Sequence, residues 1–120
     1  MSEQGPGAVL EREDAGDVTV LRVKVPLLRS DDTTDAVFDQ TTTLVAAGRS
    51  RLVLNLQAVV LLASAAIGRL VLLLRKVQSA GGRLALCKVS RPIEEVLQIT
   101  HLAEVMLVYA DEQEAVRSFA

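Results

Sequence analysis

The segment Arg51–Val89, RLVLNLQAVVLLASAAIGRLVLLLRKVQSAGGRLALCKV, contains the pattern that decides the fold. Its first ten residues, RLVLNLQAVV (51–60), are rich in Val and Leu and predict a central strand. Residues 64–80 space their apolar side chains by three and four and predict a helix, which the glycines at 81–82 would end. RLALCKV (83–89) predicts the next strand. A strand, a helix and a second strand in this order favour a parallel pair joined by a right-handed crossover.

The rest of the chain continues the same alternation. VTVLRVKV (18–25) alternates apolar and polar residues as a half-buried strand does, and with a short strand at 8–12 it predicts a hairpin. The remaining predicted elements are helices within 29–48, 90–99 and 111–119 and a strand at 104–109. The order β-β-α-β-α-β-α-β-α predicts an α/β fold with a mixed, mostly parallel sheet of about five strands and about four helices.

Length and composition favour one domain with an aliphatic core. The chain has 120 residues and is 50% hydrophobic, yet it contains only two Phe, one Tyr and no Trp, so the core must be built from Leu, Val, Ile and Ala. We expect residues 1–7 to be a disordered N-terminus and residues 8–120 to form the single domain. The net charge of −2, without a basic block, argues against nucleic-acid binding.

Cysteine use and hydropathy favour a soluble, cytoplasmic protein. Cys87 is the only cysteine, so an internal disulfide and a cysteine-based zinc cluster are excluded, and its strand pattern predicts a buried, inert thiol. The polar N-terminus is unlike a signal peptide. The apolar run 58–68 is too short to span a bilayer and Arg69 follows it, so we expect no direct membrane insertion.

The junction between the predicted central strand and the following helix contains one hydroxyl group, that of Ser64. In α/β sheets, functional groups gather where strands end and helices begin. The first interpretation makes Ser64 the N-cap of the helix, because serine is a favoured cap. The alternative makes it a phosphoacceptor at the positive helix end. A nucleophilic role is disfavoured, because no Gly-x-Ser-x-Gly elbow surrounds Ser64 and His101, the only histidine, lies near the end of a later helix.

A rotation of about 100° per residue gives this helix two unlike faces. The face expected to pack on the sheet contains Ala66, Ile67, Leu70, Leu74 and Val77. The opposite face carries what we call the apolar strip, which consists of Ser64, Ala65, Gly68 and Leu72 and is rimmed by Arg69, Arg75 and Lys76. Small residues let another backbone approach and a leucine supplies an anchor, as in compact protein interfaces. A passive surface is the alternative, because isolated exposed apolar residues are common.

The segment from Leu52 to Phe119, and more weakly the chain from residue 8 onward, resembles the STAS domain, named for sulphate transporters and anti-sigma factor antagonists. In the phosphorylatable antagonists of that family the junction reads Asp-Ser-Ser-Gly-Leu-Gly, and a partner anti-sigma kinase phosphorylates the second serine. By this resemblance the Asp falls on Ala63, the first serine on Ser64 and the phosphoacceptor on Ala65. The resemblance therefore implies a complex that a kinase acting at residue 65 cannot switch.

The resemblance implies a bacterial signalling protein that takes part in transcription regulation. It implies a non-enzymatic anti-sigma factor antagonist that binds an anti-sigma factor or a histidine-kinase-like ATPase. The implied partner-binding residues are Ala63, Ser64, Ala65, Gly68, Arg69, Leu72 and Lys76. Two alternatives stay open: a STAS subunit of a membrane lipid-transport ABC ATPase complex, and a stressosome-type scaffold that assembles with copies of itself.

The sequence predicts no enzyme, no cofactor and no metal site. A single histidine, His101, does not make a metal site alone and is interpreted as a surface or capping residue. Asp31 and Asp32 precede a predicted helix, where a capping and helix-dipole role is favoured over metal or acid-base chemistry.

Overall fold

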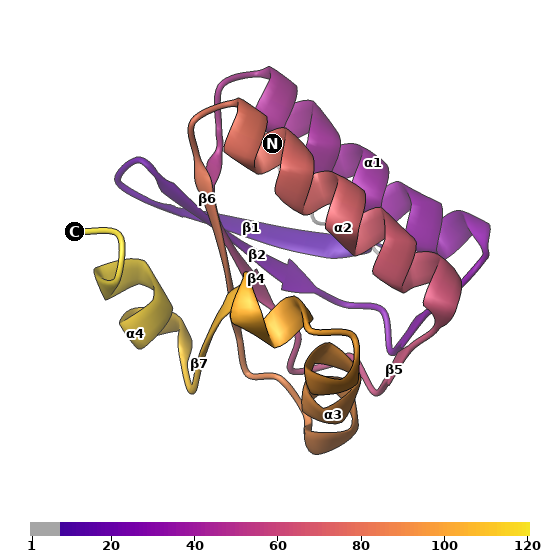
Figure 1. Ribbon diagram of the computed structural model, residues 1–120. Coiled ribbons are helices and arrows are strands. Elements are labelled where there is room, and N and C mark those ends of the chain that lie inside the picture. The colour runs from indigo at the N-terminus through magenta and orange to yellow at the C-terminus, as the bar shows by residue number, and fades with distance from the viewer. Residues whose placement is uncertain (1–7) are drawn as a thin grey trace.

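The computed structural model describes residues 8–120, so the disordered segment predicted at residues 1–7 lies outside the described residues. The strands of the main sheet are β1 Leu10–Ala15, β2 Val18–Val23, β4 Arg51–Asn55, β6 Arg83–Cys87 and β7 Leu107–Tyr109. They lie in the order β1-β2-β4-β6-β7 (Figure 1). β1 and β2 form an antiparallel hairpin, and every other neighbouring pair is parallel. The predicted mixed, mostly parallel sheet is confirmed.

Helices cover the two faces of the sheet unequally. They are α1 Asp32–Ala46, α2 Ser64–Ser79, α3 Arg91–Ile99, the 3-10 helix η1 Leu102–Glu104 and α4 Glu112–Arg117. α1 and α2 run side by side over one face, whereas the short α4 packs on the other (Figure 1). Among the described residues, no helix is long and apolar enough to cross a bilayer.

The central strands fill a core on each side of the sheet. In β4, Leu52 and Leu54 pack into the larger core under α1 and α2, whereas Val53 packs into the smaller core under α4. In β6, Leu86 belongs to the larger core and Cys87 to the smaller one. Burial on both faces explains why these segments are continuous apolar runs instead of alternating patterns.

The thiol of Cys87 is fully buried, as its strand pattern predicts. Burial raises the pKa of this thiol to about 12, and the carboxylate of Glu112 adds to the shift. The sulfur is therefore protonated and neutral at physiological pH, the state in which a thiol is a poor nucleophile.

The central strand is shorter than the predicted 51–60. β4 ends at Asn55, whose side-chain oxygen accepts the backbone N–H of Gln57 at 2.8 Å and turns the chain out of the sheet. The chain then enters a second, two-stranded parallel sheet, in which β3 (Leu27–Leu28) pairs with β5 (Leu61–Leu62). The sequence does not predict this small sheet, because strands of two residues have no measurable periodicity.

Capping and glycine residues define the ends of the two long helices. The side chain of Asp31 accepts the backbone N–H of Thr34 at 2.8 Å and caps α1, and this hydrogen bond lowers the pKa of Asp31 to about 2. Gly81 follows α2 with a φ of +76°, which glycine adopts without strain. Gly82 lies so close to Ser50 that a Cβ atom would sit 2.0 Å from the Ser50 carbonyl oxygen. The predicted glycine stop is confirmed.

Candidate partner-binding surface

The loop between β4 and α2 has a fixed backbone and exposed apolar side chains. The N–H of Val60 donates to the carbonyl of Pro26 at 2.8 Å, and the N–H of Ala63 donates to the carbonyl of Leu28 at 2.9 Å. The side chains of Val60 and Leu61 are nevertheless 58% and 45% exposed. The β3–β5 pairing therefore presents two large apolar side chains to solvent at the start of α2.

Ser64 is not the N-cap of α2, so the first interpretation of this serine is wrong. Ala63 occupies the N-cap position with extended backbone (φ −77°, ψ 163°) and makes no side-chain capping hydrogen bond. The bond from Ala63 to Leu28 keeps residue 63 extended beside β3, so the change from extended to helical backbone falls before Ser64. Ser64 is instead the first helical residue, and its side chain is exposed.

The apolar strip lies on the solvent face of α2. Leu72 is 52% exposed, Ala65 and Gly68 are exposed, and a Cβ atom added to Gly68 would meet no atom within 4 Å. Helical spacing of three and four residues places Leu72, Gly68 and Ala65 in one line along α2. The opposite face is buried, at Ala66, Leu70, Leu73, Leu74 and Val77. The structure thus leaves the predicted strip residues Ala65, Gly68 and Leu72 exposed on α2, and Val60 and Leu61 are exposed shortly before the helix begins.

Arg69 borders this surface but is held by α1. Its guanidinium donates to the carboxylates of Asp35 and Asp39 at 2.5 Å and 2.9 Å. The same guanidinium lies 5.4 Å from the ring centroid of Phe38. Arg69 therefore joins α2 to α1, whereas Lys76 at the other end of the strip is exposed.

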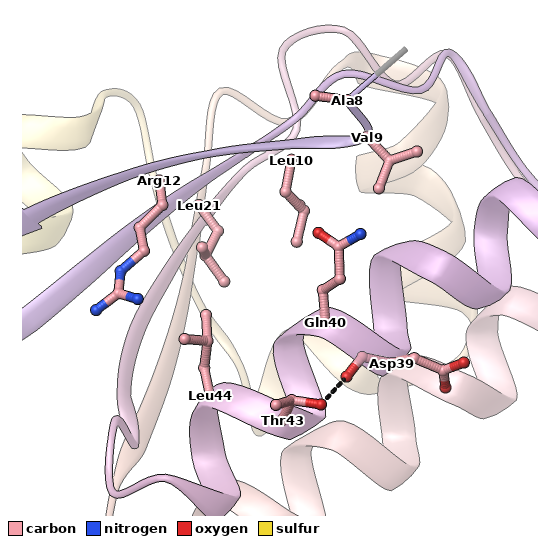
Figure 2. A pocket seen from close by; sticks show the side chains of 9 residues that line it. All are labelled: Ala8, Val9, Leu10, Arg12, Leu21, Asp39, Gln40, Thr43 and Leu44. Atoms are coloured by element: carbon pink, nitrogen blue, oxygen red, sulfur yellow. Dashed lines mark hydrogen bonds between the residues drawn. The ribbon is translucent and has the colours of Figure 1, made fainter. Parts of the chain in front are cut away.

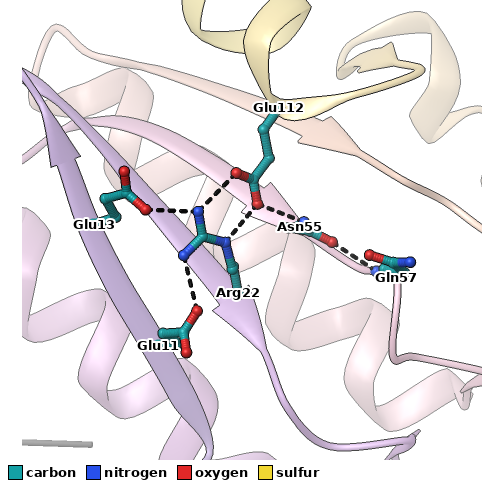
Figure 3. A network of polar contacts seen from close by, with 6 residues as sticks. All are labelled: Glu11, Glu13, Arg22, Asn55, Gln57 and Glu112. Atoms are coloured by element: carbon teal, nitrogen blue, oxygen red, sulfur yellow. Dashed lines mark hydrogen bonds and ion pairs between the residues drawn. The ribbon is translucent and has the colours of Figure 1, made fainter.

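A polar network that sequence reasoning missed joins α4 to the sheet (Figure 3). Arg22 of β2 donates to Glu112 through Nε at 2.7 Å and through Nη2 at 2.9 Å. It also donates to Glu11 at 2.8 Å and to Glu13 at 2.7 Å, both on β1. The hydrogen bonds that Arg22 donates, first to Glu112 and then to Glu13 and Glu11, raise the pKa of Arg22, and the bond that Glu112 accepts from Arg22 lowers the pKa of Glu112.

Asn55 carries the network from α4 to the loop after β4. Its side chain is almost fully buried, donates to Glu112 at 2.6 Å, and accepts the N–H of Gln57 (Figure 3). One signal was present in the sequence, namely an asparagine within an apolar strand, where a buried amide requires partners. The partner itself was hidden, because Glu112 is 57 residues away along the chain.

The other candidate features of the structure contain none of the residues of the apolar strip. A hollow of about 350 Å³ between β1 and α1 is lined by none of the predicted contact residues (Figure 2). His101 is exposed in a left-handed conformation and pairs with Glu104 at 2.5 Å. Within residues 8–120, no group of three His, Cys, Asp or Glu residues is placed to hold a metal ion.

Sequence comparison defines the class of protein to which this fold belongs. The profile of the STAS domain family matches residues 10–115, which is most of the chain. The chain therefore belongs to the STAS domain family, as the resemblance of its central segment predicted. A comparison with curated protein sequences finds no match.

Solved structures support the same assignment. An anti-sigma-factor antagonist (STAS) domain protein from Planctomyces limnophilus is 26% identical, with a TM-score of 0.81 over 92% of this chain and 97% of that one. An anti-sigma factor antagonist from Mycobacterium paratuberculosis is 22% identical, with a TM-score of 0.78 over 95% and 96%. The phosphorylated form of the Bacillus cell-fate determinant SpoIIAA is 20% identical, with a TM-score of 0.72 over 92% and 99%. The last two show that the fold is shared.

Proposed function

We propose that this chain is a non-enzymatic regulator of the anti-sigma factor antagonist type. It binds a partner protein through the apolar strip and the loop before α2. The observation that carries this proposal is Leu72, a leucine 52% exposed in line with Ala65 and Gly68. Burying one leucine side chain in an interface contributes roughly 1.5–3 kcal/mol, which makes Leu72 the natural anchor of the contact.

The partner we propose is an anti-sigma factor or a histidine-kinase-like ATPase of the bacterial cytoplasm. The relatives described as anti-sigma factor antagonists support this partner class. The small residues Ala65 and Gly68 let a partner backbone approach α2 closely, and the open space above Gly68 leaves room for it. Lys76 supplies a positive rim for an acidic partner surface.

Phosphorylation does not control this complex at the family's usual position, because residue 65 is an alanine. A phosphate there would add about −1.5 to −2 charges to the strip and oppose burial of Leu72. Ala65→Ser would supply the missing acceptor, and we expect a partner kinase with ATP to phosphorylate that variant and release it. Ser64 is exposed, yet we expect little phosphate on it; phosphopeptide mapping of the native chain after incubation with the kinase checks this.

The proposal is tested by titrating the native chain with the anti-sigma factor kinases encoded in the source genome. Leu72→Glu should weaken binding to the cognate kinase by more than about tenfold, because a charge replaces the anchor. Leu107→Glu, at a leucine of similar exposure (48%) on β7, should bind like the native chain. Equal binding by native chain and Leu72→Glu would refute the assigned surface. Binding only to a lipid-transport ATPase subunit would instead assign the chain to the alternative class.

A further inference from the structure

The two edges of the main sheet differ in chemistry. β1 forms one edge and carries charged residues at every position from Glu11 to Asp14. β7 forms the other edge and lies within an uncharged run, Val105–Ala110, of sequence VMLVYA. Natural proteins protect an open edge with charges, proline or a covering element, because unpaired backbone groups invite another strand. β1 has this protection, whereas β7 has neither charge nor proline, and only its length of three residues limits pairing at this edge.

The backbone of β7 directs one residue toward the open edge. The N–H of Lys88 donates to the carbonyl of Tyr109 at 3.3 Å, so the polar backbone groups of Tyr109 point toward β6. The direction of the backbone N–H and C=O groups alternates along a strand. The backbone groups of Leu107 therefore also point toward β6, and the backbone groups of Val108 point away from the sheet. Val108 therefore offers one N–H and one C=O to an incoming strand.

The side chains beside this edge are apolar and exposed. Leu107 is 48% exposed although its partner in register, Ala85, is fully buried. Val105, just before the strand, is 57% exposed. Leu107 and Tyr109 share the α4 face of the sheet, since Ala85 belongs to the core under that helix. An added strand would cover Leu107 on this face.

We propose that a second copy of this chain occupies the edge, with β7 paired antiparallel to β7 about a two-fold axis between the two Val108 residues. One outward-facing residue is self-complementary in this arrangement, because two such residues exchange both N–H···O=C bonds. In the same register, Leu107 of one copy lies opposite Tyr109 of the second copy, and this contact forms twice. The two five-stranded sheets then become one continuous sheet.

The chemistry of the edge favours this pairing over others. Pairing of β7 with β1 of another molecule would set Leu107 and Val108 against the charges of Glu11–Asp14, and it would leave further edges open. The two-fold pairing closes after two copies. A strand of three residues buries less than the roughly 800 Å² per partner of a standard interface, so association is expected between about 10 µM and about 1 mM.

The β7 edge is separate from the proposed partner surface. In Figure 1, β7 and the start of α2, beside β5, lie on opposite sides of the fold. A dimer would thus leave the apolar strip of each copy open to a partner molecule of its own. Self-association through β7 does not depend on the proposed function, and each has its own variant.

Sedimentation velocity of the full chain from about 1 µM to about 1 mM tests the proposal. The native chain should shift from monomer toward dimer, Leu107→Glu should weaken association more than about tenfold, and Leu72→Glu should associate like the native chain. Thermal unfolding of all three proteins checks that each is folded. Amide exchange should show the N–H of Val108 becoming protected as concentration rises. A native chain that stays monomeric, or a Leu107→Glu variant that dimerises normally, would overturn the proposal.

Discussion

Glu112→Ala removes the carboxylate that connects α4 to the sheet and, through Asn55, to the loop before α2. The substitution deletes three hydrogen bonds, two from Arg22 at 2.7 Å and 2.9 Å and one from Asn55 at 2.6 Å. Arg22 keeps Glu11 and Glu13, so its charge stays paired. Asn55 is 7% exposed and loses the acceptor of its amide, which costs about 1–3 kcal/mol for a buried donor.

We therefore expect Glu112→Ala to lower the free energy of unfolding by about 2–3 kcal/mol. Glu112→Gln keeps an oxygen acceptor and should lose about half of that. Gln113→Ala, at the exposed neighbouring position, should change the free energy by less than about 0.5 kcal/mol and serves as the control. Urea unfolding followed by circular dichroism measures all three.

Acid titration tests the same contact, because the direction of the pKa shift of Glu112 determines how the free energy of unfolding changes with pH. The hydrogen bond with Arg22 lowers the pKa of Glu112 in the folded protein, so its stabilising effect is present above the pKa of the unfolded chain. That effect disappears as the pH falls through the lowered folded pKa. In this acidic range, the native chain should therefore no longer have a higher free energy of unfolding than Glu112→Gln. A Glu112→Ala protein as stable as the native chain at neutral pH would refute the reasoning.

Three further predictions concern the fold. Gly82→Ala should lower the free energy of unfolding by at least about 2 kcal/mol, because the added Cβ would lie 2.0 Å from the Ser50 carbonyl oxygen. Urea unfolding measures this change, and an unchanged free energy of unfolding would contradict the close contact. Asp31→Ala should lower the melting temperature at pH 7 but not near pH 2, since the capping carboxylate has a folded pKa of about 2 and an unfolded value of 3.8. Cys87 should react with a thiol reagent at pH 8 only upon unfolding, because burial raises its pKa to about 12; rapid labelling of the folded chain would disprove this.

The sequence predicted the sheet and its helices because their signals are local and repeated. Leu52–Leu54 and Leu84–Leu86 are apolar without interruption, and Gly81 ends α2 in the conformation that glycine favours. The order of the elements then predicted a mixed, mostly parallel sheet with right-handed crossovers. The exposed face of α2, with Leu72 between polar neighbours, followed from helical periodicity alone.

The features that were missed depend on contacts between distant segments. Ser64 was assigned as the N-cap from residue preference, but pairing of Ala63 with Leu28 decides where α2 begins. The link from Arg22 to Glu112 spans 90 residues, and no local pattern reports it. Arg69 was predicted at the rim of the strip, yet it binds the carboxylates of Asp35 and Asp39 on α1. These residues lie 34 and 30 positions earlier in the sequence, and only folding brings them close to Arg69.

The central claim is that the apolar strip binds a partner protein, and Gly68→Arg tests it most directly. An arginine fits the open space above residue 68 and is a better helix former than glycine, so the variant should unfold at the same or higher urea concentration, with a gain of up to about 1 kcal/mol. Calorimetric titration with the cognate anti-sigma factor kinase should show binding lost in this intact fold. A Gly68→Arg protein that binds the kinase with native affinity would contradict the claim.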